Sequence, residues 1–190
     1  MKSSKTTRWL SKPLALISVL FASFWSLPAR ADLDVKLVGA WSYARPISDP
    51  STFYSPSLAQ SYGILFDLPI IKTFKIDFGF LALPRSYTAS GSTTEFTAYH
   101  FPAVGHYFLA PSFAVGLGGY YDLMATQGFS ARGYGAVASV LYDYTIIPGV
   151  GWIFDGRYQY GLSDVDPSGT SSTHFTEWVG ITGFRLGFSR

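Results

Sequence analysis

The stretch Glu177-Trp-Val-Gly-Ile-Thr-Gly-Phe-Arg-Leu-Gly-Phe188 decides which fold this chain is expected to adopt. Successive side chains of a β-strand point to opposite faces, so the stretch divides into two sets with a period of two. The even-numbered set has no charge: Trp178, Gly180, Thr182, Phe184, Leu186 and Phe188. The odd-numbered set holds every charge: Glu177, Val179, Ile181, Gly183, Arg185 and Gly187. Such a strand suits a barrel wall between hydrocarbon and a polar interior.

The beginning of the chain indicates export. Lys2, Lys5, Arg8 and Lys12 form a basic segment, residues 14–25 form an apolar core, and Ala29-Arg30-Ala31 has the small-x-small pattern of a cleavage site. The alternative, a membrane anchor, requires about 20 apolar residues in a helix, and the segment between two prolines at 13 and 28 is too short for that. We therefore expect a signal peptide over residues 1–31 and one domain over residues 32–190.

The composition restricts the class of protein further. Charged residues make up 14% of the chain and aromatic residues 18%, so the surface has few groups that favour water. After residue 31 there is no apolar run of 18 residues, which excludes membrane-spanning helices and leaves a closed β-barrel as the way to cross a bilayer. The chain has no cysteine, so it has no disulfide and no thiolate site. The expected signal peptide holds five of the 14 Lys and Arg residues and no Asp or Glu, so the rest of the chain has a negative net charge and no basic surface for nucleic acid.

Alternating apolar and polar residues predict eight strands joined by connections that are alternately long and short. The expected strands are 33–44, 58–68, 74–83, 95–108, 113–122, 132–144, 150–161 and 177–188. The expected long loops are 45–57, 84–94, 123–131 and 162–173. The expected short turns are 69–73, 109–112 and 145–149. Sequential hairpins with both termini on one side give short periplasmic turns and longer outer loops.

This pattern resembles the small eight-stranded outer-membrane barrels of the OmpA, OmpX and OmpW kind. The spacing Gly183-x-x-Leu186-x-Phe188 also resembles the C-terminal signal by which bacterial outer-membrane barrels are recognised for assembly. The resemblance implies an all-β, eight-stranded antiparallel up-and-down transmembrane barrel in the cell outer membrane of a Gram-negative bacterium. The partners that it implies are outer-membrane lipid, lipopolysaccharide and the barrel assembly machinery.

The distribution of charge supports a membrane barrel. Ten charged residues lie on the face opposite the aromatics: Asp34, Lys36, Asp67, Lys75, Asp77, Asp143, Asp155, Arg157, Glu177 and Arg185. A Lys or Arg facing lipid at mid-bilayer costs roughly 2–4 kcal/mol, so this segregation is expected of a membrane barrel. The alternative is a soluble barrel or sandwich with aromatics inside. Its solvated faces would not be as rich in Gly, Ala and Ser as these faces are.

The strand over residues 95–108 is ambiguous because it contains Pro102, which cannot donate to a ladder and could mark a bulge that reverses the two faces. The preferred assignment places Tyr99, Phe101 and Tyr107 outside. It places His100 and His106 inside, as packing or rim residues. Two imidazoles without a third ligand are a weak metal signal.

An eight-stranded barrel is narrow enough for side chains to fill it, so the inward acids and bases are expected to pair and plug the interior. The alternative is a proton or ion path, since ionisable groups within a membrane are functional candidates. At the periplasmic end, Arg185 is expected to reach two carboxylates, with Asp34 on the neighbouring first strand and Asp155 on the seventh. The interior is thus expected to be closed.

The function expected from these features is a structural or surface-interaction role exercised through the outer loops, with a surface ligand that is unknown. No catalytic, cofactor-binding or metal-ligating residue is expected, and no cofactor. One alternative is a lipid A-modifying enzyme, because His174-Phe-Thr-Glu177 resembles the His/Ser/Glu set of the lipid A deacylase barrels, with Thr176 in place of Ser. A second alternative is a carrier or narrow channel for a small ligand.

Overall fold

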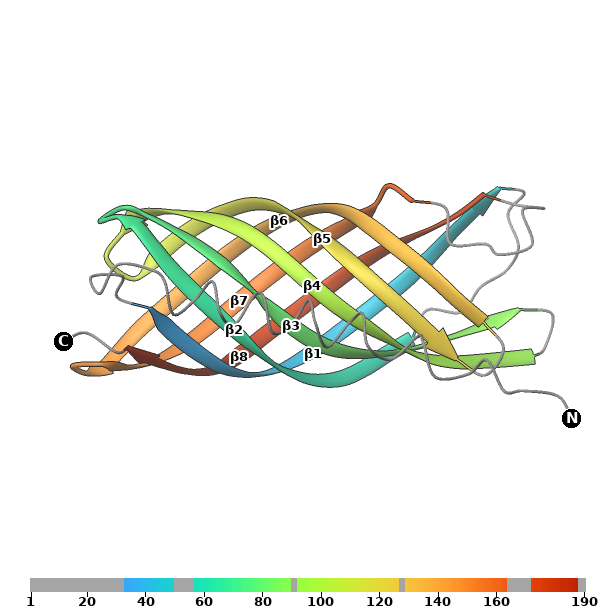
Figure 1. The fold of residues 1–190 in the computed structure, drawn as a ribbon, viewed down its shortest axis with the longest axis horizontal. Helices are drawn as coiled ribbons and strands as arrows, with labels where there is room; N and C mark the ends of the chain where they lie inside the picture. The colour runs from blue at the N-terminus through green and yellow to red at the C-terminus, as the bar shows by residue number, and fades with distance from the viewer. Residues whose placement is uncertain (1–32, 50–56, 90–91, 127–128, 164–171, 188–190) are drawn as a thin grey trace, which may run out of the picture. The chain divides into compact units, whose positions relative to one another are not determined.

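The computed structural model describes residues 33–49, 57–89, 92–126, 129–163 and 172–187. They form eight strands: β1 (Asp34–Asp49), β2 (Ser57–Ile71), β3 (Phe74–Ala89), β4 (Ser92–Ala110), β5 (Phe113–Thr126), β6 (Phe129–Ile147), β7 (Val150–Gly161) and β8 (Ser172–Gly187). Each strand pairs antiparallel with the next, and β8 pairs with β1, so the sheet closes into a barrel (Figure 1). The predicted fold is confirmed. No described segment is a helix long and apolar enough to cross a membrane.

The three short turns lie at one end of the barrel, and each consists of two residues. The two strands that each turn joins have a register shift next to it. The turn between β6 and β7 shows why the sequence folds back there. Pro148 and Gly149 are its central residues, and Gly149 has φ +81°, a left-handed value that glycine adopts without steric cost. The turns expected at 69–73, 109–112 and 145–149 are present, but each is shorter than expected because the strands continue to Ile71, Ala110 and Ile147.

The long connections were predicted less well, because the strands continue into them. The hairpin of β3 and β4 is paired as far as Ala89↔Ser92, and that of β5 and β6 as far as Thr126↔Phe129. The expectation that residues 84–94 form an exposed loop is therefore wrong. Antiparallel backbone pairing continues between polar Ser and Thr residues after the apolar alternation has ended, so periodicity alone places the boundary too early.

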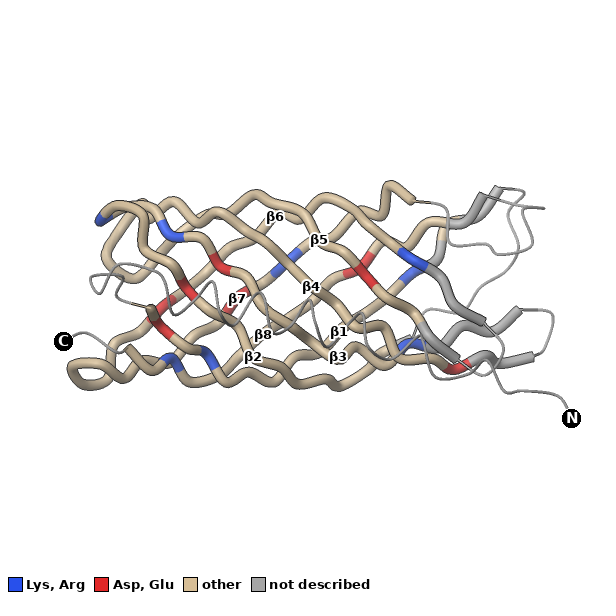
Figure 2. Tube along the Cα trace, in the orientation of Figure 1, with Lys and Arg blue, Asp and Glu red and all other residues tan. Residues whose placement is uncertain are grey.

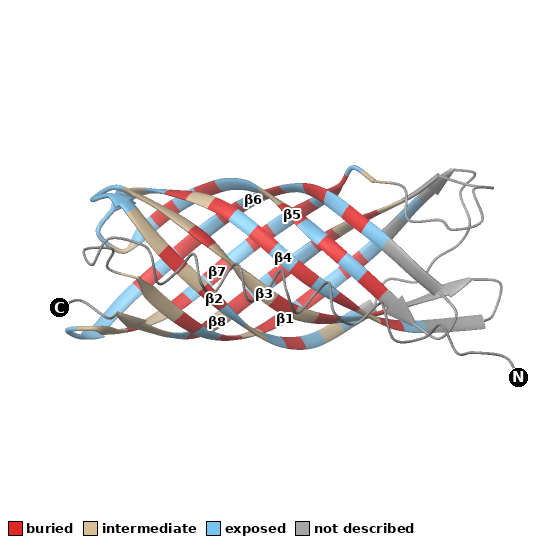
Figure 3. Ribbon diagram, viewed as in Figure 1, coloured by how far each residue is buried: buried red, intermediate tan, exposed pale blue. Residues whose placement is uncertain are grey.

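Burial alternates along the strands, and the two faces are those expected from the sequence (Figure 3). Outward-facing aromatics are exposed, as Trp178 (61%) and Tyr62 (75%) are, whereas the charged side chains of Lys36 and Asp77 are fully buried inside. Charged residues lie in strands at several levels along the barrel (Figure 2). A soluble barrel would have the opposite arrangement, so that alternative is wrong.

The strand that contains Pro102 keeps its register. Phe78 pairs with Ala103 and Leu81 with His100, which is the same alignment on both sides of the proline. Between these two pairs, two residues of β3 and two of β4 are unpaired. Pro102 is one of them, and it has no N–H to donate to the ladder. Consequently no bulge reverses the faces, and the preferred assignment is confirmed: His100 and His106 are fully buried.

Small residues on the inner face allow the wall to curve tightly. A Cβ atom on Gly183 would collide with the carbonyl oxygen of Leu37 on β1, and a Cβ on Gly63 would collide with that of Phe80 on β3. Both glycines therefore mark places where neighbouring backbones approach too closely for a side chain. The narrow lumen that results brings side chains from opposite walls into contact.

Candidate functional site: the barrel interior

The first group of interior charges lies at the end with the short turns. The Arg185 guanidinium donates from Nε to Asp143 Oδ1 at 3.0 Å and from Nη1 to Asp34 Oδ2 at 3.4 Å. Its Nη2 also donates to Thr145 Oγ1 at 3.1 Å. Lys75 Nζ lies 3.4 Å from Asp34 Oδ2 and 3.9 Å from Asp143 Oδ2. In this group, here called the end cluster, Asp143 is buried but Arg185, Lys75 and Asp34 are partly exposed, so water screens their interactions.

The expectation that Arg185 reaches two carboxylates is confirmed, but one of the expected partners is wrong. Arg185 binds Asp34 and Asp143, not Asp155. The reason is the register of β7 against β8, in which Gly151 is opposite Arg185 and Asp155 is opposite Ile181. Asp155 therefore lies four residues further along the barrel, about 13 Å at ~3.3 Å per residue, and binds other groups.

The second group, the middle cluster, is fully buried and joins opposite walls. Lys36 Nζ contacts Asp67 Oδ1 at 2.7 Å and Asp77 Oδ2 at 2.8 Å. Arg157 Nη2 contacts Asp77 Oδ1 and Asp155 Oδ2, each at 2.7 Å. Because Asp77 accepts from both cations, the ion pairs run without interruption from β2 through β1 and β3 to β7. The inward acids and bases are thus paired, as expected from the sequence.

His106 extends the middle cluster. Ser139 Oγ donates to Asp155 Oδ1 at 2.6 Å, so its hydrogen is already used. It therefore accepts from His106 Nε2 at 2.8 Å, which places a proton on that nitrogen. The other ring nitrogen, Nδ1, is buried without a partner, as expected of a bare nitrogen in a neutral ring.

The third group, the outer cluster, lies toward the long connections. Arg85 Nη1 donates to Asp122 Oδ2 at 2.9 Å, and its Nη2 donates to Glu177 Oε2. His100 Nδ1 lies 2.6 Å from Asp122 Oδ1, and His100 Nε2 lies 3.2 Å from Gln159 Nε2. The Arg85 guanidinium also lies over the ring of Phe175, 5.5 Å from its centroid. All five polar side chains are buried.

Sequence reasoning missed Arg85 because it assigned that residue to a loop. The alternation of β3 could have found it. Lys75 and Asp77 face inward at odd-numbered positions, and residue 85 is also an odd-numbered position of this strand. The alternation of the expected strand 113–122 also puts Asp122 on the inner face, but it indicates no partner for it. Arg85, which binds both carboxylates of the outer cluster, was therefore not predictable as long as the strand was expected to end at residue 83.

Among the residues that the structure describes, inward carboxylates outnumber inward Lys and Arg by seven to five. The carboxylates are Asp34, Asp67, Asp77, Asp122, Asp143, Asp155 and Glu177. The cations are Lys36, Lys75, Arg85, Arg157 and Arg185. In the outer cluster, one guanidinium serves two carboxylates. A further positive charge would balance the two carboxylates of this cluster.

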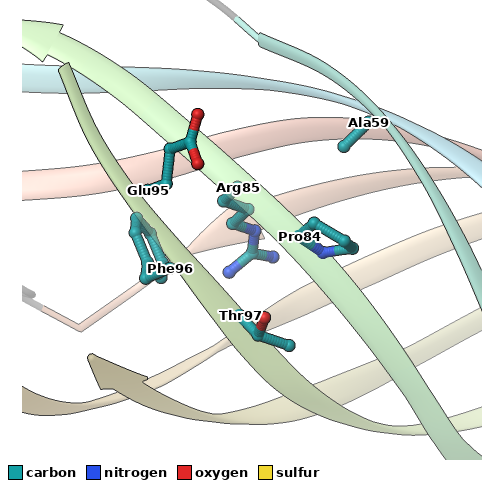
Figure 4. A pocket seen from close by; sticks show the side chains of 6 residues that line it. All are labelled: Ala59, Pro84, Arg85, Glu95, Phe96 and Thr97. Atoms are coloured by element: carbon teal, nitrogen blue, oxygen red, sulfur yellow. The ribbon is translucent and has the colours of Figure 1, made fainter. Parts of the chain in front are cut away.

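The wall is interrupted beside the outer cluster. Pairing between β2 and β3 ends at Tyr62↔Ala82, although both strands continue, and Pro84 lies just past this last pair. Proline has no N–H for a ladder and is typical of such an edge. A cavity of about 370 Å³, here called the seam cavity, opens there (Figure 4). It is lined by Ala59, Pro84, Arg85, Glu95, Phe96 and Thr97.

No protein-family model and no curated protein matches this chain. Several solved structures are similar. The outer membrane protein OprG from Pseudomonas aeruginosa is 16% identical, with a TM-score of 0.62 over 85% of this chain and 98% of that one. Neisserial surface protein A is 19% identical, with a TM-score of 0.54 over 82% and 97% of the two chains.

A third similar structure is Ail, the attachment invasion locus protein of Yersinia pestis, solved in complex with the heparin analogue sucrose octasulfate. It is 13% identical, with a TM-score of 0.51 over 82% of this chain and 99% of that one. This chain has the fold of the small outer-membrane barrels. At such identities the similarity establishes the fold alone.

The residues that resembled a lipid A deacylase set are not brought together in this barrel. His174 and Thr176 lie on the outward-facing side of β8, and His174 Nδ1 is 3.1 Å from the carbonyl oxygen of Ser163. Glu177 points inward and binds Arg85. A relay through these three side chains is therefore not formed. Within the described ranges, no group of three or more His, Asp or Glu side chains is placed to hold a metal ion.

Proposed function

We propose that this chain is an outer-membrane barrel with a closed interior, whose role is structural and directed to the cell surface through its outer connections. The observation that carries this proposal is the middle cluster. Lys36, Asp77 and Arg157 are fully buried and link opposite walls through contacts of 2.7 and 2.8 Å. A hydrated path for solutes would have to break these contacts, and unpaired buried charges are costly.

The outer face supports the proposal of outer-membrane lipid and lipopolysaccharide as partners. Aromatic side chains such as Trp41 (47% exposed) and Tyr142 (46% exposed) line the wall, where they suit the interfaces of a bilayer. The last strand supports the assembly machinery as a further partner, with Leu186 and Phe188 as the terminal apolar pair; Phe188 lies outside the described residues. Export by a signal peptide over residues 1–31, which also lie outside them, is part of the proposal.

Conductance in planar lipid bilayers tests the closed interior. The wild-type barrel should pass no steady ion current, whereas Arg157→Ala should pass a measurable one because it removes the side chain that crosses the lumen. Arg132→Ala is the matched control, since Arg132 is exposed on the outer face, and it should behave as the wild type does. A steady current through the wild-type barrel would refute the proposal.

A second candidate function, a carrier for a small apolar ligand, is favoured by the seam cavity. Its lining combines Phe96 and Pro84 with an opening where β2 and β3 are unpaired. An apolar fluorescent probe in detergent should then bind the wild-type barrel and lose affinity in Ala59→Trp, which fills the cavity. Ala136→Trp, on the exposed outer face, is the control. Equal binding by both variants would eliminate this candidate.

A further inference from the structure

The outer cluster contains two buried oxygen atoms that lack a partner and belong to neighbouring residues. They are Gln159 Oε1 and Glu177 Oε1. Gln159 and Glu177 are direct partners in the pairing of β7 with β8, and both side chains point inward and are buried. Cβ atoms of such partners are about 4.5–5.5 Å apart, so the two side chains are within reach of each other. Two bare acceptors on directly paired residues in a dry interior are unfavourable.

The amide of Gln159 can be rotated by 180° without moving any other atom. The oxygen and nitrogen of an amide are assigned from the hydrogen bonds that they make, because the two ends have the same shape. After rotation, the amide oxygen takes the place now held by Nε2, 3.2 Å from His100 Nε2. The amide nitrogen then takes the place of the bare Oε1, from which it can donate an N–H to Glu177 Oε1 on the paired residue. The rotation thus gives partners to both bare oxygens.

The rotation has one requirement, which is a proton on His100 Nε2. His100 Nδ1 lies 2.6 Å from Asp122 Oδ1, and a carboxylate only accepts, so Nδ1 carries a proton as well. Both ring nitrogens are then donors, and the ring is an imidazolium. The other groups that face it fit a positive charge: Asp122 and Glu177 are acids, and only Arg85 is cationic. The Tyr120 ring lies beside it, 5.0 Å between centroids.

We propose that His100 is a buried proton-binding site that is occupied in the folded barrel. The bound proton closes a ring of hydrogen bonds in which Arg85 donates to Asp122 and Glu177, His100 donates to Asp122 and Gln159, and Gln159 donates to Glu177. The ring joins β3, β4, β5, β7 and β8 across the lumen beside the seam cavity. Its two cations balance its two carboxylates, which supplies the positive charge that the outer cluster otherwise lacks.

His106 provides an internal comparison on the same strand. Its Nε2 donates to Ser139, and its Nδ1 has no acceptor within reach, so a second proton there would have no partner. We therefore infer different charge states for two equally buried histidines. His100 is charged because both of its nitrogens meet acceptors, and His106 is neutral because only one does.

Nitrogen NMR of the ¹⁵N-histidine-labelled barrel in lipid nanodiscs tests the proposal. The measurement is made one pH unit above about 6.5, where a free histidine has lost its proton. His100→Gln and His106→Gln assign the signals. Both nitrogens of His100 should show protonated shifts, and His106 should show one protonated and one bare nitrogen. A bare nitrogen on His100 at this pH would overturn the proposal, and this result needs no variant to fold beyond those used for assignment.

Two further variants test whether the hydrogen bond to Gln159, rather than burial alone, keeps the second proton on His100. Gln159→Leu removes the acceptor of the second proton, so His100 should change to a neutral ring with one bare nitrogen at the same pH. Ser139→Ala removes the partner of His106 and should leave His100 doubly protonated. If His100 stays doubly protonated in Gln159→Leu, the ring through Gln159 is wrong.

Discussion

Replacing Arg157 by Ala is the sharpest test of how the middle cluster holds the barrel together. Arg157 is fully buried and contacts Asp77 and Asp155 at 2.7 Å each. The substitution leaves Asp155 without a cation within 3 Å and leaves Asp77 with Lys36 alone. Breaking a buried pair by removing one partner costs roughly 3–5 kcal/mol, because the remaining charge stays buried. We expect a loss of this size in the free energy of unfolding.

The assay is urea unfolding of the barrel in lipid vesicles, with stability taken from linear extrapolation. Arg132→Ala, on the exposed outer face, should change the free energy of unfolding by less than about 0.5 kcal/mol. Combining Arg157→Met with Asp77→Asn should cost less than the two single changes together, with a coupling of about 0.5–3 kcal/mol, because the double variant has fewer orphan charges. If the single costs simply add, the two residues are not coupled across the lumen and the reasoning is wrong.

Three other outcomes are expected. Because the chain lacks cysteine, Ser168→Cys in the expected outer loop 162–173 should react with an impermeant maleimide on intact cells, and Ser112→Cys at a short turn should not; labelling of Ser112→Cys would reverse the orientation. Phe188→Ser should lower the amount of heat-modifiable folded barrel in the outer membrane, whereas normal amounts would remove Phe188 from the assembly signal. Arg185→Ala should cost only about 1 kcal/mol, since the end cluster is partly exposed; a loss as large as that for Arg157→Ala would contradict this distinction.

The sequence was sufficient to predict which way each side chain of a strand points. Period two is a local property, and the contrast between an aromatic outer face and a small or charged inner face is strong in every expected strand except 95–108, where Pro102 left the two faces ambiguous. The position of Lys36 inside and Trp41 outside follows from counting alone, and the structure has both. The order of the strands around the barrel also follows from the sequence, because sequential hairpins leave only one order in a closed barrel.

The contacts across the lumen could not be predicted in the same way, because they depend on the stagger between strands. The error in the partners of Arg185 illustrates this point: Asp155 faces inward on the neighbouring strand, but it lies four residues away along the axis, and Arg185 binds Asp143 on β6 instead. The same applies to Arg85, which reaches Asp122 and Glu177 only because β3 continues beyond the predicted end. Loop lengths do not determine this stagger. The sequence therefore predicted that inward acids and bases would pair, but not which residues would form each pair.

The interior charges also bear on how the register is chosen during folding. A slip of one residue between strands would turn Lys36 and Asp77 toward lipid, and the apolar pattern already opposes it. A slip of two residues keeps every face correct, so the apolar pattern does not oppose it. Such a slip would, however, move Lys36 by about 6.6 Å, at ~3.3 Å per residue, from Asp67 and Asp77, which it now contacts at 2.7 and 2.8 Å. The ion pairs therefore distinguish registers that hydrophobicity leaves equivalent, which gives the plug a role in specifying the barrel as well as in closing it.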